Sequence, residues 1–213
     1  MAVKGVIFDL DGVIVFTDKF HYQAWKKMAD GMGIYFDEEI NNRLRGVSRM
    51  ASLEIILERY EGEPLSQQKK EELAEKKNED YRELLHTMTR DDVTEEVRHT
   101  LAELRKRGYK LSIGSSSKNA RFILERVGLA DAFDAISDGN NIQRSKPDPE
   151  VFQKAAEFLG EKPEDCLVVE DAEAGIRAGI AGGMKTAAIG DAVHCKLGDY
   201  ELSTFSDLLK ILD

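Results

Sequence analysis

The sequence contains little cysteine and no long hydrophobic segment. Its 213 residues include two cysteines, Cys166 and Cys195, which form neither a CxxC pair nor a zinc-binding spacing. No apolar run approaches the length of about 18 residues that a membrane-spanning helix needs. The N-terminus enters a strand-like run too early for a signal peptide. We therefore expect a cytoplasmic protein without a membrane partner.

Basic residues are outnumbered by acidic ones, 30 to 40, which gives a formal net charge of −10 at pH 7. This charge disfavours a nucleic-acid partner, and an anionic substrate would need a local cluster of cations. The composition, 42% hydrophobic and 33% charged, is that of an ordinary globular protein. The length allows one large domain or two unequal ones.

Short apolar runs alternate with helical patterns over most of the chain. The strand-like runs begin at Gly5, Tyr109, Cys166 and Lys185. Helical periodicity falls at about 95–107, 119–127, 149–159 and 172–181. This alternation predicts an α/β fold with a doubly wound, mostly parallel sheet, whose ligands bind beyond the carboxyl ends of the strands.

Residues 16–94 depart from the alternation, because they show helical periodicity alone. The pattern predicts an α-helical cap domain inserted after the first strand. The core domain would then consist of residues 1–15 and 95–213. Within the insertion, the lysine- and glutamate-rich run at 69–77 predicts a solvated helix face with i,i+4 pairs.

Two aspartates, Asp9 and Asp11, follow the first apolar run. Side chains two residues apart in extended chain point the same way, and Gly12 allows the chain to turn directly afterwards. Like charges this close require a cation between them or a proton on one of them. The pair is typical of a Mg²⁺ site, of a nucleophile beside an acid/base, or of both. From the motif alone, a solvated turn at a strand end stays open.

Polar residues also follow the later strands. Ser115 precedes a predicted helix N-terminus that can hold an anion, although serine is equally a good helix cap. Lys146 lies before Pro147, which disfavours helical backbone there. Glu170 and Asp171 end an apolar strand, and acids at that place favour a metal site once a neighbouring strand carries Asp9 and Asp11.

Taken in order, these motifs resemble those of the haloacid dehalogenase-like superfamily of phosphotransferases, and the resemblance covers essentially the whole chain. The four matching segments are Asp9-Leu10-Asp11-Gly12, Gly114-Ser115, Lys146-Pro147 and Glu170-Asp171. The resemblance implies Asp9 as the nucleophile that forms an aspartyl-phosphate, Asp11 as general acid/base, and Ser115 and Lys146 as ligands of the phosphoryl group. It also implies Mg²⁺ as cofactor, held by Asp9, the backbone carbonyl of Asp11, Glu170 and Asp171.

Two segments of the insertion, 17–25 and 44–49, are most similar to the β-phosphoglucomutase family within that superfamily. This implies that Thr17 and His21 assist Asp11. The implied substrate-binding residues are Arg45, Gly46, Val47, Arg49, Ser117, Lys118 and Asn119. The implied reaction interconverts β-D-glucose 1-phosphate and D-glucose 6-phosphate, with glucose 1,6-bisphosphate as intermediate and primer. Arg45 and Phe16 depart from the family pattern, which generally has a lysine and an acidic residue there.

Two other functions remain open. A sugar-phosphate phosphatase would use the same core, with water attacking the aspartyl-phosphate. A phospho-accepting signalling domain uses similar groups but is small and has no helical insertion. We expect an enzyme that acts as a monomer on a small sugar phosphate.

Overall fold

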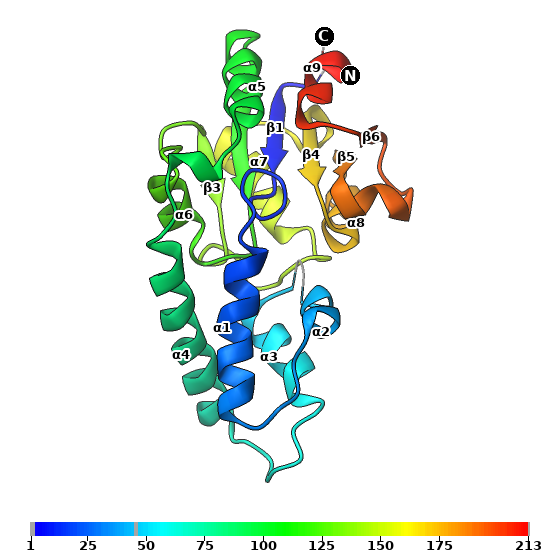
Figure 1. Cartoon of the computed structure of the whole chain (residues 1–213). Coiled ribbons are helices and arrows are strands. Elements are labelled where there is room, and N and C mark those ends of the chain that lie inside the picture. The colour runs from blue at the N-terminus through cyan, green and yellow to red at the C-terminus, as the bar shows by residue number, and fades with distance from the viewer. Residues whose placement is uncertain (1–2, 45–46, 213) are drawn as a thin grey trace.

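The computed structural model describes residues 3–44 and 47–212, and within them six parallel strands form one sheet in the order β3-β2-β1-β4-β5-β6 (Figure 1). The strands are β1 (Gly5–Phe8), β2 (Lys110–Gly114), β3 (Ala135–Ser137), β4 (Cys166–Glu170), β5 (Lys185–Ile189) and β6 (Tyr200–Leu202). Phe8 of β1 is in register with Ile113 of β2 and Val169 of β4. The residues that follow these three strands are therefore neighbours, as the sequence predicted.

Helices cover both faces of the sheet. They are α5 (Glu95–Lys106), α6 (Ala120–Arg126), α7 (Glu150–Leu159), α8 (Glu173–Ala181) and α9 (Leu208–Ile211). Val6 and Phe8 pack into one apolar cluster with α5 and α6, whereas Ile7 packs into another with α7. Because both faces are buried, β1 carries apolar residues on consecutive positions. The predicted α/β class with a parallel sheet is confirmed.

Short 3₁₀ helices occur in the connections between these elements. They are η1 (Arg90–Asp92), η2 (Pro163–Asp165), η3 (Gly190–Cys195) and η4 (Phe205–Asp207). In the part of the chain that the structure describes, no helix has the length and apolar character that crossing a membrane requires.

A helical insertion separates β1 from β2 and lies beyond the carboxyl end of the sheet (Figure 1). It contains α1 (Asp18–Gly31), α2 (Glu38–Asn42), α3 (Arg49–Leu57) and α4 (Gln67–Leu85). Trp25, Leu53 and Ile56 belong to an apolar cluster of its own. By contrast, Phe20 and Leu85 join the main core. The exact division into a cap domain and a core domain stays a prediction.

Candidate active site

The ends of β1 and β4 are joined by one buried lysine. Lys146 Nζ donates to Asp9 Oδ1 and to Glu170 Oε1, each at 2.5 Å. Burial alone would lower the pKa of Lys146, but the charges of Asp9 and Glu170 outweigh it and raise this pKa above the usual lysine value. Burial raises the pKa of Glu170, while Lys146 acts in the opposite direction. Lys146 is therefore a fixed positive charge beside Asp9.

Three carboxylates at this edge suit a small, hard cation. Asp9, Glu170 and Asp171 can each offer one oxygen, and these atoms lie within 4.8 Å of one another. Oxygen donors in such a cluster are the ligands that Mg²⁺ prefers. Gly12 has φ +89°, and a Cβ at that position would lie 2.0 Å from Asp171 Oδ2. A side chain at position 12 would thus push Asp171 out of the cluster.

Asp11 forms a hydrogen bond with the start of the insertion. The hydroxyl of buried Thr17 donates to Asp11 Oδ1, although Thr17 occupies the N-cap position of α1, where a threonine would ordinarily cap the helix. Burial and the charge of Asp9 raise the pKa of Asp11 to about 7, and the Thr17 hydrogen bond only partly offsets this shift. A carboxyl with that pKa can both donate and accept a proton near neutral pH.

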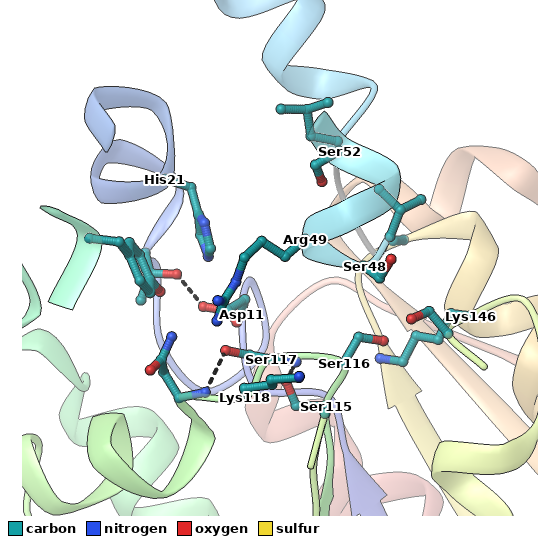
Figure 2. Close-up of a pocket in the computed structure, with 18 of the residues that line it drawn as sticks. Asp11, His21, Ser48, Arg49, Ser52, Ser115, Ser116, Ser117, Lys118 and Lys146 are labelled. Atoms are coloured by element: carbon teal, nitrogen blue, oxygen red, sulfur yellow. Dashed lines mark hydrogen bonds between the residues drawn. The ribbon is translucent and has the colours of Figure 1, made fainter. Parts of the chain in front are cut away.

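The loop after β2 turns through consecutive serines. Ser115 is buried, and its Oγ accepts from Ser117 N at 3.1 Å; Ser117 Oγ accepts in turn from Asn119 N at 3.1 Å. These bonds shape the loop that leads into α6. Figure 2 shows Ser115, Ser117 and Lys118 at the base of the pocket, facing Arg49 of the insertion.

On the insertion side, His21 faces a buried lysine that the sequence analysis did not identify. Lys77 Nζ lies 3.0 Å from His21 Nδ1 and above the rings of Trp25 and Tyr81, at 4.5 and 4.6 Å from their centroids. The ring of His21 stacks on Tyr81 with 4.1 Å between centroids. Burial lowers the pKa of Lys77 to about 7, with a further lowering by Arg49. The pKa of His21 falls well below its usual value, first through burial and then through Lys77.

The prediction of a solvated helix face over 69–77 is wrong at Lys77, whose exposure is 3%. The buried positions of α4 are Ala74, Lys77, Asn78, Tyr81 and Leu85. Their spacing of three and four residues is that of a buried helix stripe. The signal was present in the sequence, but the charge-rich composition obscured it.

Arg49 begins α3, directly after its N-cap Ser48. Its Nη1 donates to Glu75 Oε2 at 2.9 Å. Asn119, expected to bind substrate, instead donates from Nδ2 to Asn78 Oδ1 at 2.9 Å, so that the core loop and α4 are connected. Neither Glu75 nor Asn78 was predicted as a site residue.

All predicted site residues that the structure describes line a single cavity of about 810 Å³ between the sheet and the insertion (Figure 2). They are Asp9, Asp11, Thr17, His21, Val47, Arg49, Ser115, Ser117, Lys118, Asn119, Lys146, Glu170 and Asp171. Arg45 and Gly46 lie outside the described residues. Phe16 also borders the cavity but remains 66% exposed. The volume is in the range of small-molecule binding sites.

Known proteins resemble this chain over nearly its full length. It is 40% identical over 207 residues to the β-phosphoglucomutase of Bacillus subtilis (strain 168), and the aligned region covers 97% of this chain and 92% of that protein. It is 31% identical over 196 residues to the fructose-1-phosphate phosphatase YqaB of Escherichia coli (strain K12), covering 91% and 96% of the two chains.

Similarity in three dimensions extends equally far. The crystal structure of the β-phosphoglucomutase from Clostridium difficile matches with a TM-score of 0.91 and 35% identity, covering 97% of this chain and 93% of the other. A family model described as haloacid dehalogenase-like hydrolase matches residues 3–183. The match spans Asp9, Ser115 and Glu170 at the ends of their strands, and Lys146 in the loop between β3 and α7. The chain therefore belongs to the haloacid dehalogenase-like hydrolase family.

Proposed function

We propose that this protein is a β-phosphoglucomutase, which interconverts β-D-glucose 1-phosphate and D-glucose 6-phosphate through glucose 1,6-bisphosphate. The observation that carries the proposal is the composition of the single cavity. A carboxylate, a fixed lysine and a carboxylate cluster line its core side, whereas Arg49, His21 and Lys77 line its insertion side. A core that transfers one phosphoryl group, with the cations Arg49 and Lys77 on the opposite wall, suits a substrate that carries two phosphates.

In the first half-reaction, an oxygen of Asp9 attacks the phosphorus of glucose 1,6-bisphosphate. The P–O bond to the sugar breaks as the aspartyl-phosphate forms. Attack by one anion on another requires positive charge around the transferring group, which Lys146 supplies from 2.5 Å away from Asp9. Ser115 orients the phosphoryl oxygens at the end of β2.

Asp11 moves the proton in both directions. When the sugar oxygen leaves, Asp11 protonates it; when the other hydroxyl of the sugar attacks the aspartyl-phosphate, Asp11 accepts its proton. A pKa of about 7 suits both roles. Thr17 donates to Asp11 from the start of α1, so a movement of the insertion changes the position of the acid/base.

The carboxylates of Asp9, Glu170 and Asp171 fit Mg²⁺. We propose that they hold it together with the backbone carbonyl of Asp11. When bound, the ion supplies further positive charge to the oxygens of the phosphoryl group.

Arg49 is proposed to bind the phosphate that is not transferred. Its guanidinium can form two parallel hydrogen bonds to phosphate oxygens, and Lys118 and Asn119 line the same cavity. Binding energy from this distal phosphate would close the insertion over the core and assemble the site around Asp11. Water offers no such energy and is therefore a poor acceptor.

A sugar-phosphate phosphatase is the second candidate, favoured by the similarity to the fructose-1-phosphate phosphatase. The two functions differ in the fate of the phosphoenzyme. Single-turnover decay of phosphorylated protein, with and without glucose 6-phosphate, measures this fate directly. We expect glucose 6-phosphate to accelerate the decay and to become glucose 1,6-bisphosphate. Equal decay in both cases, with inorganic phosphate as the product, would establish the phosphatase instead.

His21→Ala sharpens the same measurement. His21 lies on α1 four residues after Thr17 and contacts Lys77. We expect the variant to lower transfer to glucose 6-phosphate by about 100-fold, the scale of a small misplacement of a catalytic group. Hydrolysis of the aspartyl-phosphate should change much less, so the ratio of the two rates should narrow. A parallel loss of both rates would assign His21 to the core reaction or to folding.

A further inference from the structure

Arg49 already has a carboxylate partner in this structure. Its Nη1 donates to Glu75 Oε2 at 2.9 Å, and both residues line the cavity. The side chain of Arg49 is 23% exposed, whereas that of Glu75 is 62% exposed. The cation is thus held at the cavity wall, and its carboxylate partner reaches it from the solvent side of α4. An anionic ligand that binds Arg49 has either to share the guanidinium with Glu75 or to displace Glu75 from it.

Glu75 is also connected to the core loop. Asn78 Nδ2 donates to Glu75 Oε1 at 3.2 Å, and Asn119 Nδ2 donates to Asn78 Oδ1 at 2.9 Å. Asn78 and Asn119 are both buried. A chain of hydrogen bonds therefore extends from Arg49 through Glu75 and Asn78 to the loop after β2. If the Glu75 carboxylate moves away, the Nδ2 group of Asn78 loses this acceptor. Asn78 is also the residue that accepts the hydrogen bond from Asn119.

Charge and shape explain why a carboxylate stands there. Arg49 lies close enough to Lys77 to lower the pKa of its ammonium group, so these two side chains bring positive charge to the same wall of the cavity. A carboxylate and a phosphate both offer paired oxygens to a guanidinium, but the phosphate ester brings up to two negative charges. Glu75 is therefore a weaker substitute for a phosphate on Arg49.

We propose that Glu75 is a specificity-determining residue, which occupies the phosphate position on Arg49 in the free enzyme and is displaced by the distal phosphate of the substrate. The inference rests on the proposed role of Arg49. Ligands without a phosphate at that position do not displace Glu75, and the Arg49–Glu75–Asn78–Asn119 chain then stays intact. When the distal phosphate displaces Glu75, the hydrogen bonds that connect Arg49 through Glu75 and Asn78 to the loop after β2 are broken.

The test is the affinity of Glu75→Gln for glucose 6-phosphate, measured by calorimetry in the presence of Mg²⁺. Glutamine keeps the shape of the side chain and can still accept from Asn78, but it has no charge to compete with the ligand. We expect binding about two- to fivefold tighter than in the wild type, the range of an ion pair that is partly exposed. In an Arg49→Ala background the same substitution should have no effect.

Glu79→Gln is the matched control. Glu79 lies one helical turn further along α4, pairs with Lys76 at 3.3 Å and is also 62% exposed. It is not among the described residues that line the cavity, and its substitution should leave the affinity unchanged. Thermal unfolding of each variant checks that the fold is retained.

Weaker binding by Glu75→Gln would overturn the proposal, because it would make Glu75 a group that orients Arg49 for the ligand. Unchanged binding would overturn it too. Inorganic phosphate serves as a second probe that separates this proposal from the proposed function. If the wild type does not convert β-glucose 1-phosphate, the mutase function fails, whereas an Arg49-dependent gain in phosphate affinity for Glu75→Gln would still support the role of Glu75.

Discussion

On the core side of the cavity, Lys146 contacts two carboxylates at 2.5 Å each, and its pKa is raised. On the insertion side, Lys77 is equally buried but contacts the ring nitrogen of His21 and two aromatic faces, and its pKa is lowered to about 7. Two buried lysines of one cavity thus differ in whether their charge is compensated. The first stays charged near neutral pH, whereas the charge of the second depends on its surroundings.

This difference matches the two tasks of the proposed mutase. Transfer of a phosphoryl group always needs positive charge at Asp9, so a permanently charged Lys146 suits the core. Selection of the acceptor needs groups that respond to the substrate. Lys77 and Arg49 lie together on the insertion side, where an incoming phosphate would compensate their charge. Each substitution below removes a group from one side of the cavity and has an effect that follows from the charge or chemistry of that side.

The largest effect is expected for Asp9→Asn. An amide is a poor nucleophile and also weakens the proposed Mg²⁺ site, so turnover should fall by at least about 10⁴-fold and no phosphoenzyme should form. Asp11→Asn is the companion variant: it should lose turnover but keep much of its Mg²⁺ binding. Phosphoenzyme is measured with radiolabelled acetyl phosphate. Appreciable multiple turnover by Asp9→Asn would rule out the proposed mechanism.

Lys146→Met tests the compensated charge of the core. Without the lysine, Asp9 and Glu170 are buried without a cation, and the free energy of unfolding in EDTA should fall by about 3–5 kcal/mol. Added Mg²⁺ should recover part of the loss, because the proposed Mg²⁺ site uses the same carboxylates. Lys154→Met is the control, since Lys154 forms an exposed pair with Glu157 at 3.2 Å. Urea unfolding measures both variants. Similar small losses in the free energy of unfolding would contradict the prediction that Lys146 compensates the charges of Asp9 and Glu170.

The core side of the site was predictable because strand patterns determine it. The apolar runs that became β1, β2 and β4 placed Asp9, Ser115 and Glu170 at one edge once the strands were parallel. The two outermost strands, β3 and β6, were not predicted. Each has three residues at an edge of the sheet, too few to give a periodic pattern.

The insertion side was harder to predict, because helix packing decides which polar residues it buries. Lys77, Asn78 and Glu75 lie in a lysine- and glutamate-rich segment where solvation is the usual outcome. The similarity to a known family identified Arg49 and His21. It did not indicate that Arg49 pairs with Glu75, because that contact joins α3 to α4 and depends on how the helices meet.

Arg49→Ala tests whether the insertion acts only on substrates with a second phosphate. We expect mutase turnover to fall by about 30- to 150-fold, corresponding to about 2–3 kcal/mol for a charge-assisted contact. Phosphorylation of Asp9 by acetyl phosphate should change little, because this donor lacks a distal phosphate. Arg43→Ala is the control, since Arg43 pairs with Glu58 at 2.8 Å on the surface. Equal losses with both donors would place Arg49 in the core reaction.

Lys77→Met gives the smallest expected effect and tests the uncompensated charge itself. The pKa of Lys77 is lowered from 10.5 to about 7 in the folded protein. Between these values the unfolded chain binds more protons than the folded one, so this residue makes stability rise with pH in that window. Below pH 7 Lys77 is protonated in both the folded and the unfolded protein, so the folded state bears the full free-energy cost of burying this charge. Methionine has a similar volume and no charge, so it removes this contribution.

We therefore expect Lys77→Met to raise the free energy of unfolding by about 1–3 kcal/mol at pH 7 and by much less at pH 9.5. The measurement is urea unfolding at several pH values in that range. Lys76→Met, at the neighbouring position with a side chain 65% exposed, should leave the pH dependence unchanged. If Lys77→Met keeps the wild-type slope, then Lys77 retains its proton in the folded state. In that case the two lysines of the cavity do not differ in charge, and acceptor selection must depend on Arg49 and its partner instead.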